Sequence, residues 1–272
     1  MPPYLNLSKP EHAYLFGFLQ GDGHLYRNKS QQGKGSLSVE LMASDKPLLE
    51  KFQAMFPFYS SILSRTRDTN FKQDYEAVTW SVSHRAFREE LEFLGLPVGS
   101  KSGTIKPPEV AYSLPDYLRG LIDADGSLGL EKHGYPFLGL TTSSDIIAST
   151  YMDFLYSLTG RRKQQGRNKR DQVYNILIFK EDAQEAAAAL YYDGCLALPR
   201  KARKAAEIVP WKRPFAMRVA HRRSLWTPEQ DTFLLCHTLQ ESMTVLGRNF
   251  NSVKIRRGRI RRAARKAQQI TD

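Results

Sequence analysis

Two short glycine-containing segments constrain the fold of this chain more than any other feature. The first reads LFGFLQGDG over residues 15–23, and the second reads LRGLIDADG over residues 118–126. Both are apolar, and both carry small residues four positions apart, which leaves one face of a helix without side-chain bulk. We therefore expect each segment to form a helix whose bare face packs against the bare face of the other.

Each segment ends in Asp-Gly, which places an acid in the last turn of the predicted helix. The glycines that follow Asp22 and Asp125 are expected to end the helices in the left-handed conformation. A carboxylate is unfavourable there, because the C-terminal end of a helix already carries partial negative charge. If the two faces pack, the two carboxylates converge, and such a site requires a divalent cation.

At these residues the chain resembles the LAGLIDADG homing endonucleases. The second segment differs from the motif that names the family only at Arg119, whereas the first differs at five positions but keeps Gly17, Asp22 and Gly23. A core helix with a glycine stop would explain one copy, but two copies with the acid at the same position favour the family. The resemblance implies a monomer with pseudo-twofold symmetry that binds double-stranded DNA and makes a metal-dependent double-strand break at a long target site.

The rest of the sequence predicts an α+β fold in which one order of elements (helix, hairpin, helix, hairpin, helix) occurs twice. In the first repeat the expected elements are a helix over 11–21, strands 23–27 and 36–41, a helix over 46–55, strands 59–67 and 75–83, and a helix over 84–94. In the second they are a helix over 115–124, strands 127–131 and 137–142, a helix over 144–158, a basic hairpin arm over 161–170 that leads into a strand over 173–179, and a helix over 181–191.

These patterns divide the chain into a first LAGLIDADG repeat (1–100), a second repeat (101–205), a basic linker (206–224) and a C-terminal helical domain (225–272). In the last domain Thr227 and Pro228 favour the start of a helix, since threonine is a common N-cap and proline a common first residue. Two more short helices follow, and the third is strongly basic. The domain resembles a Myb/SANT-type helix-turn-helix at Trp226, Glu229, Asp231, Leu246, Gly247, Arg248, Val253 and Ile260. A basic helical tail that recognises no DNA groove is the alternative.

The net charge of +12 is concentrated near the C-terminal end. Residues 199–272 carry 18 Lys and Arg against 5 Asp and Glu, whereas residues 1–198 carry 22 against 23. An excess of cations in one part of a chain is typical of polyanion binding, although a basic tail can also be a merely solvated surface.

Composition excludes several other classes of protein. The apolar runs are far shorter than the ~20 residues of a membrane span, and the N-terminus lacks a secretory signal pattern. Cys195 and Cys236 lie in different regions and away from other His or Cys residues, which argues against a disulfide framework or a zinc site. We therefore expect no membrane partner, no secretion, and a location in the cytoplasm or an organellar matrix with access to DNA.

Polar side chains on the predicted hairpin arms and in the basic tail are the candidates for DNA contact. Arginine and glutamine suit base edges because their paired polar atoms match guanine and adenine in the major groove. For any single candidate, an ordinary solvated loop residue is the alternative. The candidates are Arg27, Gln31, Gln32, Lys34, Arg65, Arg67, Lys72, Arg161, Arg162, Gln164, Arg167, Lys169, Lys212, Arg213, Arg222, Arg223, Lys254, Arg256, Arg257 and Arg259.

The predicted catalytic residues are two aspartates and two lysines. Asp22 and Asp125 would hold divalent ions, and each would serve one DNA strand. Mg2+ is the expected metal and Mn2+ a substitute, because only hard oxygen ligands are offered. Lys101 follows Asp22 by 79 residues and Lys201 follows Asp125 by 76, and the resemblance implies a basic residue near the scissile phosphate in each repeat. Linker lysines that contact only backbone phosphate are the alternative.

Two other functions fit the same resemblance. A transcription regulator of this fold would bind DNA without cutting it, but such regulators lack the motif acids, which this chain keeps as Asp22 and Asp125. A maturase would bind intron RNA and assist splicing, and the sequence leaves this open as a second activity.

Overall fold

The computed structural model describes residues 3–28, 34–68, 73–214, 217 and 226–271, with side chains as far as residue 262. The chain forms two units, Met1–Arg213 and Pro214–Asp272. None of the helices in the described ranges is long and apolar enough to cross a membrane.

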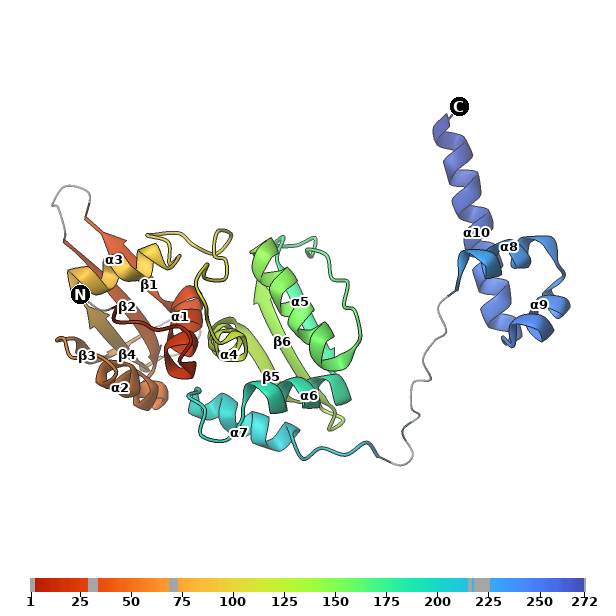
Figure 1. The fold of residues 1–272 in the computed structure, drawn as a ribbon. Coiled ribbons are helices and arrows are strands. Elements are labelled where there is room, and N and C mark those ends of the chain that lie inside the picture. Colours follow the sequence, from red (N-terminus) through yellow and green to blue (C-terminus); the bar gives the residue numbers. More distant parts are fainter. Residues whose placement is uncertain (1–2, 29–33, 69–72, 215–216, 218–225, 272) are drawn as a thin grey trace. The chain divides into compact units, whose positions relative to one another are not determined.

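The centre of the first unit is a pair of helices, α1 (Pro10–Asp22) and α4 (Leu114–Asp125), which lie side by side (Figure 1). Their contact depends on glycine. A Cβ atom on Gly17 would lie 2.1 Å from the carbonyl oxygen of Tyr117, and one on Gly120 would lie 2.2 Å from that of Tyr14. The two backbones therefore touch, as the small-residue faces predict.

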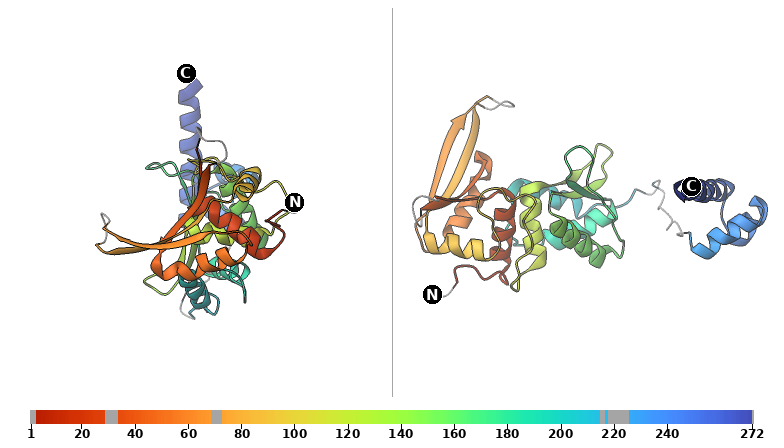
Figure 2. Two further views of the ribbon diagram at one scale, coloured as in Figure 1. Left: turned by 90° about the vertical axis from the view of Figure 1, so that its left-hand side faces the viewer. Right: turned by 90° about the horizontal axis from the view of Figure 1, so that it is seen from above.

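The first repeat continues from α1 into a four-stranded antiparallel sheet of order β1-β2-β4-β3. Its elements are β1 (His24–Arg27), β2 (Gly35–Met42), the 3-10 turn η1 (Ala43–Asp45), α2 (Lys46–Ala54), β3 (Ser61–Arg67), β4 (Tyr75–Val82) and α3 (Arg85–Phe93). Burial alternates along β2, where Leu37, Val39 and Leu41 face the core, and the strand contacts α1 and α3. The opposite face of the sheet is open, and the β3–β4 hairpin extends beyond the body of the repeat (Figure 2).

The second repeat has the same order of elements with one strand fewer. Its elements are β5 (Gly126–Leu130), β6 (Pro136–Thr142), α5 (Asp145–Thr159), β7 (Tyr174–Phe179), α6 (Glu181–Leu190) and α7 (Pro199–Ile208). The three strands pair in the order β5-β6-β7, and residues 126–208 are all described. Ser144 caps α5 as expected, since its Oγ accepts a hydrogen bond of 3.3 Å from the backbone N–H of Ile147. The duplicated α+β architecture predicted from the sequence is thus confirmed.

The prediction of a hairpin arm over 161–170 is wrong, because this segment is irregular and contributes no strand. Its polar side chains take the hydrogen bonds that a neighbouring strand would otherwise make. The Nζ atom of Lys163 donates to the carbonyl oxygen of Leu177 on β7 (2.8 Å), and Arg167 donates to those of Gln172 (2.6 Å) and Ser143 (2.8 Å). With no apolar alternation in its sequence, the segment has no face to bury against α5 or α6.

The motif helices also end differently from the prediction. Gly23 has φ −73° and Gly126 has φ −98°, so neither is left-handed. Glycine is required for space instead. A Cβ on Gly23 would lie 2.6 Å from the carbonyl oxygen of Leu19, and one on Gly126 would lie 2.7 Å from that of Ile122. The two glycines let the chain pass directly from each helix into β1 or β5.

Helix α7 has no counterpart among the predicted elements, and it spans the boundary at 205 between the second repeat and the basic linker. Beyond it the chain stays against α6. Gln184 Nε2 donates to the carbonyl oxygens of Val209 (2.7 Å) and Trp211 (2.8 Å), and Arg213 pairs with Glu181 at 2.5 Å. The first part of the predicted extended linker therefore belongs to the first unit.

The second unit contains three described helices, α8 (Pro228–Cys236), α9 (Leu239–Leu246) and α10 (Phe250–Thr271). The predicted N-cap is confirmed, since Thr227 Oγ1 accepts from the backbone N–H of Gln230 at 3.3 Å. Leu234 and Val253 are fully buried. Trp226 is half-buried, and the guanidinium of Arg248 packs over its ring, 3.9 Å from the ring centre.

Candidate active site

Asp22 and Asp125 are the last residues of α1 and α4, and the structure brings them together. A Cβ on Gly21 would lie 2.2 Å from the Cβ of Ala124 and 3.3 Å from Oδ2 of Asp125. The last turns of the two helices are therefore in contact, and each aspartate follows one of the touching residues. This pairing follows from the glycine contacts deeper in the helix pair, which fix the distance between the two backbones.

The two carboxylates lie in an environment that disfavours their charge. Both remain accessible to solvent, but surrounding protein raises the pKa of Asp22 to about 6, with repulsion from Asp125 as the second cause. Burial also raises the pKa of Asp125, and Lys101 and Lys201 oppose that rise. An uncompensated negative charge at this point is what a bound cation would neutralise.

Lys101 and Lys201 occupy matching positions at the ends of the two motif helices. Lys101 is half-buried, and its Nζ donates to the carbonyl oxygens of Leu19 (3.0 Å) and Gly21 on α1. Lys201 is buried, and its Nζ donates to those of Ile122, Asp123 (2.7 Å) and Gly126 (3.0 Å) at the end of α4.

Each lysine thus satisfies carbonyl groups that a helix end leaves without partners. Burial lowers the pKa of both lysines to about 8, against the attraction of the aspartates. The structure therefore places both lysines beside the aspartates rather than in a free linker.

The donors at this site fit a magnesium-type ion. No cluster of three or more His, Cys, Asp or Glu occurs in the part of the chain that the structure describes, so side chains alone do not complete a coordination shell. Mg2+ is commonly held by one or two carboxylates together with water and substrate phosphates. Asp22 and Asp125 supply such a pair of hard oxygen ligands.

Comparison with known proteins identifies the family. The model of the LAGLIDADG-like domain matches residues 9–92 and 116–190, which is more than half of the sequence. The chain belongs to this LAGLIDADG-like family. A comparison with curated proteins finds no significant match.

Several solved structures are similar to this chain, and the one with a TM-score of 0.50 shows the fold. The homing endonuclease I-WcaI bound to its DNA recognition sequence is 17% identical, with a TM-score of 0.50, over 74% of this chain and 87% of that one. The homing endonuclease I-LtrWI bound to target DNA is 11% identical, with a TM-score of 0.47, over 73% and 88%. The homing endonuclease I-SmaMI bound to cleaved DNA is 14% identical, with a TM-score of 0.45, over 74% and 87%.

The open face of the first LAGLIDADG sheet carries two of the predicted DNA contacts. Arg65 and Arg67 project from this face of β3, and both pair with Glu40 on β2, the second at 2.6 Å. Glu40 was not predicted from the sequence. It alternates with the buried residues of β2, and this alternation places it on the open face of the sheet, with Arg65 and Arg67. The two guanidinium groups are therefore held in place before any ligand binds.

Arg27 lies elsewhere than expected. It has the same register parity as the buried Leu25 of β1, and it pairs with Glu92 of α3. Its side chain therefore belongs to the helix-covered side of the sheet. Lys34 is exposed next to the start of β2. Gln31, Gln32, Lys72, Arg222 and Arg223 lie outside the described residues.

The candidates in the second LAGLIDADG repeat lie on the irregular segment 161–170. Arg161 pairs with Asp182 at 2.6 Å, Arg162 stacks on the ring of Tyr156, and Arg167 pairs with Asp145 at 3.1 Å. The remaining two are exposed: Gln164 and Lys169. The open face beside them is mixed, since Leu177 and Phe179 of β7 lie on it together with Asn175 of β7 and Thr141 of β6. The two repeats therefore offer different surfaces.

The basic candidates in the C-terminal part divide into structural and exposed residues. Arg256 forms a two-point ion pair with Asp231 (2.5 and 2.7 Å), and Arg257 donates to the carbonyl oxygen of His237. Both hold the helices of the second unit together. The exposed candidates are Lys212, Lys254 and Arg259. Arg213, paired with Glu181, is half-buried.

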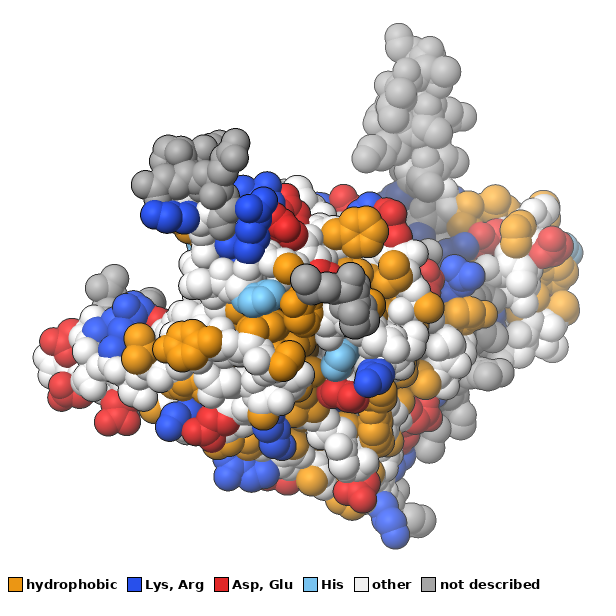
Figure 3. All heavy atoms as spheres, turned by 60° about the vertical axis from the view of Figure 1, so that its left-hand side comes forward, with side chains coloured by type: hydrophobic (Ala, Val, Ile, Leu, Met, Phe, Trp, Pro, Cys, Tyr) orange, Lys and Arg blue, Asp and Glu red, His pale blue; other side chains and the backbone are white. Residues whose placement is uncertain are grey.

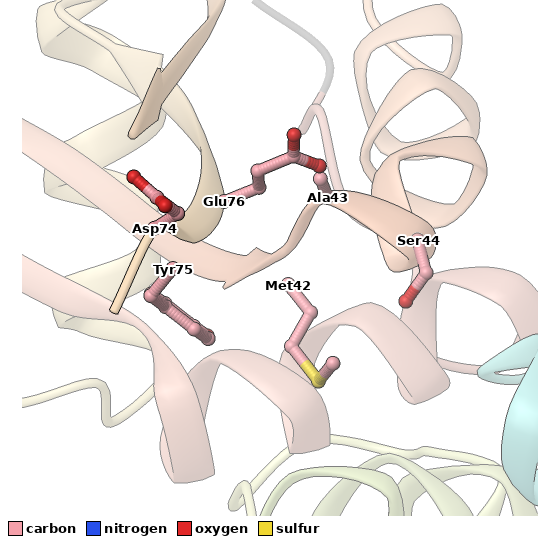
Figure 4. A pocket seen from close by; sticks show the side chains of 6 residues that line it. All are labelled: Met42, Ala43, Ser44, Asp74, Tyr75 and Glu76. Atoms are coloured by element: carbon pink, nitrogen blue, oxygen red, sulfur yellow. The ribbon is translucent and has the colours of Figure 1, made fainter. Parts of the chain in front are cut away.

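A pocket lies away from the aspartates on the surface of the first unit. It lies where β2 ends and β4 begins, and it is lined by Met42, Ala43, Ser44, Asp74, Tyr75 and Glu76 (Figure 4). None of the predicted site residues contributes to it. On the side of the molecule that Figure 3 shows, basic side chains stand beside acidic and hydrophobic ones rather than in one continuous patch.

Proposed function

We propose that this chain is a site-specific homing endonuclease that makes a metal-dependent double-strand break in DNA. The observation that carries the proposal is the pairing of Asp22 and Asp125 at the touching ends of α1 and α4. Two carboxylates at two negative helix ends do not stabilise a packed helix pair. They are useful where a cation binds between them and bridges to a phosphate of the substrate.

The residues divide the work as follows. Asp22 and Asp125 would hold Mg2+, for which Mn2+ would substitute. When bound, the metal stabilises the leaving oxygen of the phosphodiester and favours activation of a water. Lys101 and Lys201 keep positive charge beside the aspartates, where it opposes the negative charge that builds up on the phosphate in the transition state. Each repeat would cut one strand.

The DNA would contact the open face of the first sheet through Arg65 and Arg67, and the second repeat through the exposed polar segment 161–170. We propose that the second unit is a Myb-like module, with Lys254 and Arg259 of α10 as its contacts. The homing endonuclease I-WcaI, whose structure shows the same fold, was solved bound to its DNA recognition sequence, and this supports double-stranded DNA as the partner. A protein of this fold that only binds DNA would not need both aspartates.

The test is cleavage of a library of long DNA duplexes with Mg2+, followed by sequencing of the ends. We expect double-strand ends at one defined sequence. Asp22→Asn and Asp125→Asn should each reduce cutting by about 100-fold or more, as expected when a group that stabilises transition-state charge is removed. Binding should remain largely intact, because neither carboxylate reads a base.

Asp153→Asn is the matched control, since Asp153 is an exposed aspartate on α5. It should cut like the wild-type protein. Normal cutting by both active-site variants would place the catalytic centre elsewhere, and binding without any cutting by the wild type would favour the regulator.

A further inference from the structure

Two buried tyrosines connect the motif helices crosswise. Tyr14 on α1 donates its hydroxyl hydrogen bond to Oδ2 of Asp123 on α4, at 2.7 Å. Tyr117 on α4 donates to Oε1 of Gln20 on α1. Asp123 precedes Asp125 by two residues, just as Gln20 precedes Asp22. Each tyrosine therefore contacts the residue next to the active-site turn of the opposite repeat.

On the second-repeat side, Asp123 fixes the segment that carries Lys201. Its Oδ2 also accepts the backbone N–H of Leu198 at 2.6 Å, and its Oδ1 accepts the hydroxyl of Tyr191 at 2.7 Å. Leu198 is the N-cap of α7, and Lys201 lies in the first turn of that helix. The carboxylate thus holds the start of α7 against the end of α4.

On the first-repeat side, Gln20 fixes the segment that carries Lys101. Its Nε2 donates to the carbonyl oxygens of Gly95 (3.1 Å) and Lys106 (2.9 Å), one on each side of that lysine in the sequence. The two halves therefore use the same geometry with different chemistry. An ionisable carboxyl group accepts from three donors in one half, and a neutral amide bridges two carbonyls in the other.

We propose that Tyr14 and Tyr117 are positioning residues that act across the helix pair, Tyr14 on Lys201 through Asp123, and Tyr117 on Lys101 through Gln20. The proposal rests on the proposed function. It assigns each tyrosine to the cleavage of the strand that the opposite repeat serves. Loss of one hydroxyl therefore unbalances the two cuts instead of weakening both equally.

Tyr14→Phe and Tyr117→Phe keep the ring in the core and remove only the hydroxyl. Cleavage is followed on a duplex labelled separately on each strand, and Lys101→Ala and Lys201→Ala define which strand each lysine serves. Tyr14→Phe should slow the Lys201 strand by about 10- to 100-fold, the usual effect of losing a supporting hydrogen bond around a metal site. Nicked DNA should then accumulate. Tyr117→Phe should slow the other strand.

Tyr151→Phe is the matched control. Tyr151 is fully buried in α5, and its hydroxyl has no hydrogen-bond partner among the described residues. It should change neither strand. If Tyr14→Phe slows both strands equally, or slows the strand served by Lys101, the crosswise assignment is overturned.

Hydrogen exchange tests the same contacts without any cleavage. In Tyr14→Phe, peptides covering residues 191–205 should exchange faster while those covering 94–107 do not, and Tyr117→Phe should show the reverse. Equal protection in both variants overturns the positioning role. The reciprocal exchange pattern in a protein that cuts no DNA would instead uphold the positioning and refute the proposed function.

Discussion

At the scale of single residues, the folded protein disfavours the charged form of the two aspartates at the ends of α1 and α4. Burial and the neighbouring Asp125 raise the pKa of Asp22 to about 6, from an ordinary value near 3.8. A raised pKa means that the folded state keeps a proton which the unfolded state has lost. The stability linked to this proton is therefore fully present below about pH 4 and is lost as the pH rises through about 6.

Replacing the acid should remove this loss. In the absence of divalent metal, Asp22→Asn should melt at a higher temperature than the wild-type protein at about pH 8, and the difference should shrink as the pH falls below about 4. Asp125→Asn should behave in the same direction. Calorimetric melting over this pH range measures the effect, and Asp153→Asn again serves as control. A lower melting temperature for Asp22→Asn at high pH would show that the lysines outweigh the burial of the carboxylate.

Much of this site could be predicted from residue spacing, but not its support. Asp22 and Asp125 could be found because the motif repeats, and Lys101 and Lys201 because they follow at similar intervals. Glu40 and the Tyr14–Asp123 contact could not, since they join residues from separate elements. Asp123 has no evident role at the level of sequence, because Gln20 stands in the equivalent place of the first motif. The structure shows that a neutral amide can hold its own segment there.

At the scale of elements, the contact between α1 and α4 determines where everything else lies. The backbones approach so closely that even a methyl group has no room. Gly17→Ala would place a carbon 2.1 Å from a backbone carbonyl oxygen of the partner helix, and Gly120→Ala would do the same at 2.2 Å. Because both neighbours are backbone atoms, the helices themselves must separate.

We expect each of these two alanine variants to lose about 1–3 kcal/mol of stability or more, the range typical of overpacked cores. Larger side chains such as leucine should prevent folding. Gly103→Ala is the matched control, since a Cβ there meets nothing within 4 Å. Thermal melting of the three proteins provides the measurement. An unchanged melting temperature for Gly17→Ala would contradict the close helix contact.

Helices and strands could be predicted where apolar residues alternate or recur at helical spacing, as in β2 and α5. They could not be predicted in segments where basic residues predominate. Residues 161–170 resemble a hairpin arm in composition, yet Lys163 and Arg167 satisfy backbone carbonyls with their side chains. Helix α7 escaped prediction because its basic sequence resembles the linker that follows. The signals that could have indicated it are Pro199 at its first position and the buried Lys201, Ala205 and Ile208 at helical spacing.

At the scale of the whole molecule, most of the net positive charge lies outside the repeats. Residues 214–272 carry 12 Lys and Arg against 4 Asp and Glu, out of a net charge of +12. The two repeats form a unit that ends at Arg213. The second unit should therefore contribute affinity without being required for the cut.

Deletion of residues 214–272 should weaken DNA binding and make it less dependent on salt, because each phosphate contact contributes ~0.9 to the slope of log affinity against log salt. Cutting should persist at high protein concentration. Footprinting should show a shorter protected tract centred on the cut, whereas the full chain protects an asymmetric one. Equal footprints and salt slopes would mean that the second unit is not a DNA-binding module.

The unequal sheets also bear on how a genome and this protein would change together. A four-stranded sheet with a projecting arm can specify more of its half of a target than a three-stranded sheet without one. A palindromic target would present the same sequence to two sheets that differ in how many base pairs they can specify. The favoured target is therefore one whose two halves differ in information content. Cutting would tolerate mutations in the half of the target that faces the second sheet. A host lineage could then escape cutting only through mutations in the half that faces the first sheet.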